Sequence, residues 1–283
     1  MDDSKIYVGL RVWITELTTR RPGQLFSLAM VFLSIALYTQ IAFFTRRTDT
    51  LILISSYSAL FLMYWLLTRS ILSYKYLIGF GIAFRLLFVF SIPSLSDDFF
   101  RFVWDGILTK HQVNPFMYTP REIVENPLIN LPELNVRLFA ALNSPDYFSV
   151  YPPVSQFVFW LATYFAGGSL HIAVFIMKIF VFAAELGSIF MIIKLLSLHH
   201  LKREYIYYYV LNPLVVIELT GNLHFDGIMV FFVLLAVYFL HKDQLWFASM
   251  AFALAIATKL TPLILLPFFS DVSGLRVSGF FMH

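Results

Sequence analysis

The sequence predicts an all-α protein, a polytopic bundle of about seven transmembrane helices with interfacial helices in one large extracytoplasmic loop. Composition gives the first reason, because 59% of the 283 residues are hydrophobic and 13% are charged, which is unlike a water-soluble globule. The second reason is that apolar stretches recur along the chain, and about 20 apolar residues cross a hydrocarbon core as a helix. The length is therefore best counted in membrane crossings.

Charge and cysteine content exclude other classes. The net charge is +3, but the 20 Lys and Arg residues are scattered, so they indicate membrane topology and not a nucleic-acid partner. The chain has no Cys, which excludes disulfides, thiolate metal sites and a Cys nucleophile. Any chemistry must come from Asp, Glu, His, Lys and Arg.

Seven apolar stretches are long enough, or nearly so, to span a bilayer. The first lacks a cleavage site after it, so we interpret it as a retained signal anchor. The stretches are Leu25–Phe44, Thr50–Thr68, Tyr76–Pro93, Ser169–Ile193, Tyr205–Thr220, Phe225–Leu240 and Gln244–Phe269.

Basic residues in short loops stay on the cytoplasmic side. With residues 1–24 as a cytoplasmic N-terminus and seven crossings, most loop Lys and Arg residues fall inside, and Arg46 and Arg47 are the exceptions. This orientation places the loop 94–153, the turn Gly221–Asp226 and the C-terminus outside. We expect residues 1–283 to form a single membrane domain.

The loop 94–153 is the long polar interruption of the chain. Its sixty residues carry seven acids and four Lys or Arg residues (4 − 7 = −3). The apolar stretch Val154–Ala166 follows, and at about 1.5 Å per residue it is too short to span, so we expect an interfacial or re-entrant helix.

An acidic motif opens this loop. On a helix, Asp98, Arg101 and Asp105 share one face at i, i+3 and i+7. In one interpretation Ser96 caps the helix and Asp97 pairs with Arg101. In the other, two adjacent carboxylates beside a bilayer supply a general base for a lipid-linked substrate.

Charged residues inside apolar spans are functional candidates because burying a charge in lipid is costly. Arg85 lies in the middle of the third span, and Lys259 lies in the outer half of the last span, which Pro262 should kink. For Lys178 and Glu185 we expect structural pairing or snorkelling. A cation near outer carboxylates, as at Lys259, suggests a phosphate held at the membrane surface.

The short turn Gly221–Asp226 joins two spans. It carries His224 and Asp226, and a helix cap by Asn222 or Asp226 explains it as well as a binding role does.

The ordered set of motifs resembles the GT-C superfamily of integral-membrane glycosyltransferases, in particular bacterial polyprenyl-phosphate-mannose-dependent mannosyltransferases. The set that carries the resemblance is Ser96-Asp97-Asp98-Phe99-Phe100-Arg101-Phe102-Val103-Trp104-Asp105-Gly106, Val113–Pro120, Tyr151-Pro152-Pro153, Asn212-Pro213-Leu214, Gly221–Asp226 and Lys259-Leu260-Thr261-Pro262.

The resemblance implies a multi-span enzyme of the bacterial inner (plasma) membrane with its active site on the extracytoplasmic face. It implies a polyprenyl-phosphate sugar donor, a glycan or lipid acceptor, and inversion at the anomeric carbon. The residues that match the family's motifs are Asp97 or Asp98 as the catalytic carboxylate, Arg101, Trp104 and Asp105 in the same motif helix, His224 and Asp226 in the second outer loop, and Lys259. Two spans precede the motif-bearing pair where many relatives have one. The chain also stops earlier than relatives do, so we expect a truncated chain or a second subunit.

From these residues we predict transfer of mannose or another hexose. Asp97 is the first choice for the general base, Asp98 supports it or helps to hold a divalent ion, and Lys259 with Arg85 stabilises the phosphate leaving group. The sequence leaves metal dependence open.

Two other classes compete with this interpretation. In a secondary transporter, Arg85, Lys178, Glu185 and Glu218 would line a path, although the internal repeats typical of transporters are missing. An inactive or partial membrane subunit is the other alternative, which the short C-terminus favours.

Overall fold

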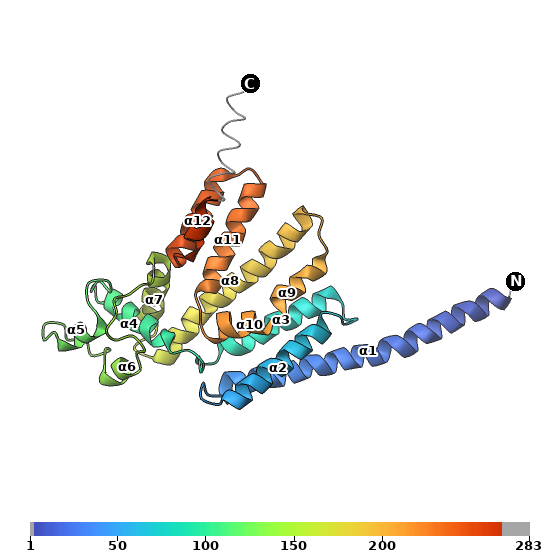
Figure 1. Cartoon of the computed structure of the whole chain (residues 1–283), viewed down its shortest axis with the longest axis horizontal. Helices are drawn as coiled ribbons and strands as arrows, with labels where there is room; N and C mark the ends of the chain where they lie inside the picture. Colours follow the sequence, from blue (N-terminus) through green and yellow to red (C-terminus); the bar gives the residue numbers. More distant parts are fainter. Residues whose placement is uncertain (1–2, 268–283) are drawn as a thin grey trace, which may run out of the picture.

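The computed structural model describes residues 3–267, of which residues 3–22 by their helical backbone alone. This part of the chain contains helices and no strand, which confirms the predicted all-α class (Figure 1). In chain order the elements are α1 (Asp3–Phe43), α2 (Thr50–Leu67), α3 (Tyr74–Val89), α4 (Asp98–Lys110), α5 (Pro120–Glu125), α6 (Val136–Ala140), α7 (Pro153–Phe165), α8 (Leu170–Leu198), η1 (Arg203–Ile206), α9 (Tyr207–Val210), α10 (Pro213–Val215), the π-helix η2 (Val216–Gly221), α11 (Asp226–His241), α12 (Leu245–Thr258) and η3 (Thr261–Leu265).

Three of the described helices are long and apolar enough to cross a membrane, namely Gly23–Phe43 within α1, α2 and α8. A fourth crossing is added if Pro213–Gly221 and α11, which meet at an angle of 113°, form one bent span. Helices α3 and α12 have 16 and 14 residues. The membrane class is supported, and the number seven stays a prediction.

One predicted span is wrong as a continuous helix. Tyr205–Thr220 is divided into η1, α9, α10 and η2, because Pro213 has no N–H for the carbonyl of Tyr209 four residues earlier. Arg85 donates from Nη2 to that carbonyl (3.4 Å) and from Nη1 to the carbonyl of Val210 (2.6 Å). An arginine inside the bundle thus satisfies backbone groups that the break leaves free.

The buried charges of α3 and α8 have different partners from those expected. Glu185 accepts from Arg85 Nε at 2.5 Å and also bonds the Tyr209 hydroxyl. Lys178 donates to the carbonyls of Phe88 (2.7 Å) and Gly221 (3.0 Å) and to Ser91 Oγ (3.2 Å). The expected pairing or snorkelling of Lys178 and Glu185 is therefore wrong, because each is fully buried and is satisfied by other elements.

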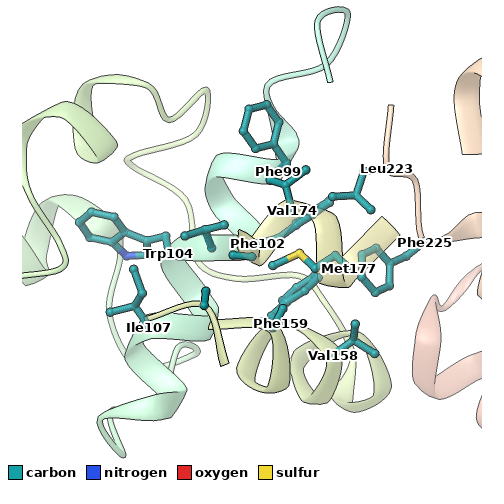
Figure 2. Packing of buried hydrophobic residues seen from close by; sticks show 14 of the residues in the cluster. Phe99, Phe102, Trp104, Ile107, Val158, Phe159, Val174, Met177, Leu223 and Phe225 are labelled. Carbon is teal, nitrogen blue, oxygen red and sulfur yellow. The ribbon is translucent and has the colours of Figure 1, made fainter. Parts of the chain in front are cut away.

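The bundle places α11 between α8 and α12, while the hairpin of α1 and α2 packs beside α3 (Figure 1). At one end of α8 a smaller unit of α4 to α7 forms a shared apolar core (Figure 2). There the ring of Phe102 stacks on that of Phe159 with centroids 4.7 Å apart. The predicted helices at Asp98 and at Val154–Ala166 are thereby confirmed as α4 and α7.

Candidate functional site

A pocket of about 310 Å³ lies where α4, α7, the start of α11 and the end of α12 meet. Four predicted site residues from three distant parts of the chain line it: Asp98, His224, Asp226 and Lys259. A second cavity of about 230 Å³ is lined by none of the predicted site residues. Its wall on α4 consists of Phe100, Val103 and Ile107, whereas Phe102 of the same helix lines the pocket at Asp98. The pocket at Asp98 is therefore the candidate site.

Lys259 and Asp226 form an ion pair at this pocket. Lys259 Nζ lies 2.8 and 2.7 Å from the two carboxylate oxygens of Asp226. An ammonium has three N–H donors, so two directed at the carboxylate leave one for a ligand. The carboxylate thus holds the cation at the pocket wall.

The sequence predicts Lys259 within the last helix. The structure instead has Lys259 directly after the helix, in extended conformation. Pro262 cannot donate to the carbonyl of Thr258 four residues earlier, so α12 ends at Thr258. Ser155 Oγ donates to that carbonyl instead, at 2.8 Å. The predicted kink is a helix end, and it turns Lys259 toward α7 and α11.

The two adjacent carboxylates of the acidic motif have separate environments. Asp97 pairs with Arg47 Nη1 at 2.8 Å and is not among the residues that line the pocket. Asp98 lines the pocket, and Asn143 Nδ2 donates to its Oδ1 at 2.7 Å. Within the described chain, Oδ2 of Asp98 accepts no hydrogen bond. The predicted pairing of Asp97 with Arg101 is wrong. The N-cap residue of α4 is Asp97, without a side-chain cap hydrogen bond, and Ser96 Oγ only accepts from Asp98 N at 3.4 Å.

Arg101, Trp104 and Asp105 lie in the core of the α4–α7 unit and not at the pocket. Arg101 donates to Asp105 (2.9 Å) and to the carbonyls of Ser144 (3.1 Å) and Tyr147 (2.9 Å). Burial raises the pKa of Asp105, against the lowering effects of Arg101 and of hydrogen bonds from Ser149 and Gln156. These groups hold the segment that leads to the pocket.

Arg85 is also distant from the pocket. Its side chain is fully buried between α3, α8 and α9, where Glu185 neutralises it. The geometry assigns Arg85 to the bundle interior and gives no contact with the candidate site.

The backbone around His224 has an unusual conformation. Leu223 has a φ of 59°, which costs a branched side chain on the order of 1 kcal/mol. It follows the π-helix η2, a feature that is frequent at functional sites. Leu223 and Phe225 are both buried in the core of Figure 2, so His224 is anchored on each side.

Sequence reasoning missed several lining residues. Tyr151, whose Tyr-Pro-Pro run is typical of loop punctuation, lines the pocket together with Ser155 and Thr258. Burial, together with the carboxylates of Asp98 and Asp105, raises the pKa of Tyr151, which keeps its hydroxyl protonated as a donor. Among the residues that the structure describes, no three His, Cys, Asp or Glu side chains group into a metal site.

A helical bundle with membrane-length helices and a pocket lined by a carboxylate, an imidazole and a lysine offers the acid–base and cationic groups of an enzyme at a membrane. The family described as alpha-(1->6)-mannopyranosyltransferase, N-terminal domain (MptA_B family), matches residues 25–273, and the chain belongs to this family. The chain is therefore an enzyme of the glycosyltransferase class that acts on mannose. No match is found among curated proteins or among solved structures.

Membership of this family overturns the transporter alternative. The charges that would have lined a transport path instead bond one another or main-chain carbonyls, as Arg85, Glu185 and Lys178 do.

Proposed function

We propose that the protein transfers mannose from a polyprenyl-phosphate donor to the 6-hydroxyl of a mannose in a glycan or lipid acceptor. The observation that carries this proposal is the pocket that both Asp98 and Lys259 line, in a chain of a mannosyltransferase family. The family description supplies the linkage, and a 1→6 linkage requires a primary hydroxyl as the attacking group.

We propose that Asp98, rather than Asp97, is the general base. As the acceptor oxygen attacks the anomeric carbon, its proton passes to Oδ2 of Asp98, which has no other described partner. The bond between that carbon and the phosphate oxygen breaks, and the electron pair leaves with the phosphate. Asp97 is held by Arg47 instead.

Lys259 is proposed to stabilise the leaving phosphate. Charge develops on the phosphate as the bond breaks, and a fixed cation within hydrogen-bond reach stabilises that charge. Asp226 orients the ammonium through two short contacts, so Lys259 is pre-positioned before the donor binds.

Seven crossings with an extracytoplasmic site are part of the proposal. The α1–α2 turn meets the start of α4 through Arg47 and Asp97, whereas the rings of His199 and His241 lie 4.6 Å apart at the far ends of α8 and α11. These contacts are consistent with successive helices that cross the membrane in opposite directions, provided that the broken segment of residues 205–221 is the fifth crossing.

Orientation then follows from charge. The loop 94–153 and the turn at 221–226 contribute residues to the same pocket. At the other helix ends, Tyr74 beside Lys75 contacts Tyr207, which follows Lys202 and Arg203, and His241 beside Lys242 contacts His199. The positive-inside rule places these basic helix ends in the cytoplasm. We therefore propose a bacterial inner-membrane protein with an extracytoplasmic site, and Asp97 offsets the contrary charge of Arg47.

The test is transfer by the purified chain in lipid. Labelled polyprenyl-phosphate mannose and a mannose-terminated acceptor are expected to give a 1→6-linked product, whereas a nucleotide-activated mannose gives none. Transfer from the nucleotide donor alone would refute the donor proposal. Transfer that appears only when a second polypeptide is supplied would favour the partial-subunit alternative.

A further inference from the structure

Glu218 lies beside the pocket and has no part in the mechanism above. On the π-helix η2, its Oε2 is 3.4 Å from His224 Nδ1 and 3.1 Å from Asn222 Nδ2. Its Oε1 is 3.5 Å from the Tyr57 hydroxyl of α2. The side chain is about one-third exposed, at 35%, so the carboxylate is partly shielded from water and directed at its neighbours.

The spacing of Glu218 and His224 depends on the irregular backbone between them. The π-helix ends at Gly221, Leu223 then takes a φ of 59°, and the chain turns by 113° into α11. The side chains of Leu223 and Phe225 are buried in the apolar core. A helix of regular geometry would not bring the imidazole back over the carboxylate, so strain and burial both act to hold this pair.

The contact selects one ring nitrogen. A carboxylate accepts hydrogen bonds and does not donate them, so the neighbouring Glu218 favours the form of His224 with a proton on Nδ1. Nε2 is then the nitrogen available to a ligand, and His224 lines the pocket while Glu218 does not. At 3.4 Å the contact is an ion-pair distance and not yet a hydrogen bond, and catalytic contacts that are long without substrate often tighten in its complex.

We propose that Glu218 is a positioning residue that fixes His224 with Nε2 toward the pocket, where His224 contacts a hydroxyl group of the mannose being transferred. This inference rests on the proposed function. It makes His224 a determinant of sugar specificity, and it gives a role to a glutamate that the sequence indicates only as a charge within a span.

A sugar hydroxyl is the ligand that best fits this nitrogen. A hydroxyl both donates and accepts, so it satisfies Nε2 whether or not that nitrogen carries a proton. Two other polar groups of the pocket have separate proposed tasks, Lys259 for the phosphate and Asp98 for the acceptor hydroxyl. Aromatic side chains of Phe102, Tyr151 and Phe225 line the same pocket and supply apolar surface for the sugar's C–H groups.

The first experiment compares polyprenyl-phosphate donors whose mannose lacks, in turn, the hydroxyl at C2, C3, C4 or C6. In the wild type, one missing hydroxyl should lower kcat/KM by about tenfold, the value of one hydrogen bond. In His224→Ala that particular loss should vanish, while losses from the other hydroxyls persist. If every loss is the same in His224→Ala as in the wild type, His224 does not contact the sugar.

Substitutions at Glu218 then test positioning. Glu218→Leu should remove the same hydroxyl-specific loss as His224→Ala, whereas Glu218→Gln should keep most of it, because an amide oxygen still accepts from Nδ1–H. Tyr57→Phe, which removes another neighbour of Glu218, is the matched control and should preserve the donor ranking. Equal slowing of all donors in Glu218→Leu, with the ranking intact, would overturn the positioning role.

A measurement without donor separates this inference from the proposed function. Nitrogen NMR of the protein labelled with ¹⁵N-histidine, with the His224 signals assigned from His224→Gln, should show a ring protonated at Nδ1. Glu218→Leu should abolish that preference. If the protein transfers mannose but His224 shows no preference for a proton on Nδ1, only the role of Glu218 is refuted. If His224 shows this preference but no polyprenyl donor supports transfer, the proposed function is refuted, and the sugar contact with it.

Discussion

Arg47 and Asp97 form an ion pair, with Nη1 2.8 Å from Oδ2, that joins the α1–α2 turn to the start of α4. Both side chains are substantially exposed, so the pair adds at most about 1 kcal/mol to stability. Its main effect concerns the neighbouring residue, because Asp97 is engaged and Asp98 is the carboxylate that lines the pocket. Two adjacent residues of identical chemistry are thereby distinguished.

Asp98→Asn should lower kcat by about 10²-fold or more, the contribution of a general base, and leave the amount of folded protein unchanged. Asp97→Asn should change kcat only a few-fold, since it affects an exposed ion pair. The measurement is transfer at saturating donor for both variants. A larger loss of kcat in Asp97→Asn than in Asp98→Asn would identify Asp97 as the general base.

Lys259→Met should raise the donor KM about 30- to 100-fold, which corresponds to the 2–3 kcal/mol of a hydrogen bond to a charged group. Lys259→Arg should retain part of the affinity because it keeps the charge. Lys242→Met, at the far end of α11, is the control and should behave as the wild type. If Lys259→Met leaves the donor concentration curve unmoved, the phosphate is bound elsewhere.

Arg85→Met should destabilise the protein and not the donor complex. Removing the guanidinium leaves Glu185 buried without its cation and the carbonyl of Val210 without a donor, which costs about 3–5 kcal/mol. Thermal unfolding in detergent should shift clearly, whereas the donor KM of the remaining folded protein should be unchanged. A raised KM at wild-type stability would restore Arg85 as a substrate-binding residue.

Gly106→Ala should weaken the packing of α4 on α7. A Cβ at Gly106 would lie 2.4 Å from the carbonyl oxygen of Phe159, so the two helices must separate, at a cost of about 1–3 kcal/mol. Gly79→Ala on α3 is the matched control, because its Cβ meets nothing within 4 Å, and it should be neutral or stabilising by about 0.5–1 kcal/mol. Comparable unfolding temperatures for the two variants would contradict this account.

Topology is tested by labelling from one side of the membrane. Single cysteines within 126–135 and near His199, introduced into this Cys-free chain, should react from the outer and the inner face respectively. Labelling of both positions from the same face would refute the seven-crossing proposal and the extracytoplasmic placement of the site.

Much of the fold follows from local patterns that the sequence contains. Helices α2 and α7 lie within a residue of the predicted ranges, because each is an apolar stretch with clear boundary residues, and α4 begins at the predicted acidic motif. Pro213 indicates a break in Tyr205–Thr220, but the apolar character of this stretch led to the prediction of one continuous span. The partner that makes such a break tolerable, Arg85, comes from a helix more than a hundred residues earlier, and no local pattern contains that contact.

The candidate site shows the same division. Asp98, His224, Asp226 and Lys259 are recognisable as motif residues, and the structure brings them to one pocket. Choosing between Asp97 and Asp98 requires the position of Arg47, and excluding Trp104 requires knowing that it is fully buried. Such facts depend on tertiary contacts that residue spacing alone does not specify.

The hydrogen bonds of Lys178 have a consequence for biosynthesis. Its ammonium in α8 bonds Phe88 and Ser91, which are synthesised earlier, and Gly221, which is synthesised later. A lone cation in a newly inserted helix is costly in lipid, so we expect α8 to be stabilised first by docking on α3. The arrival of residue 221 then completes the set of acceptors, and the turn bearing His224 is fixed only at that stage. The candidate pocket is also lined by residues 258–261, so its wall is complete only after the end of α12 has been synthesised.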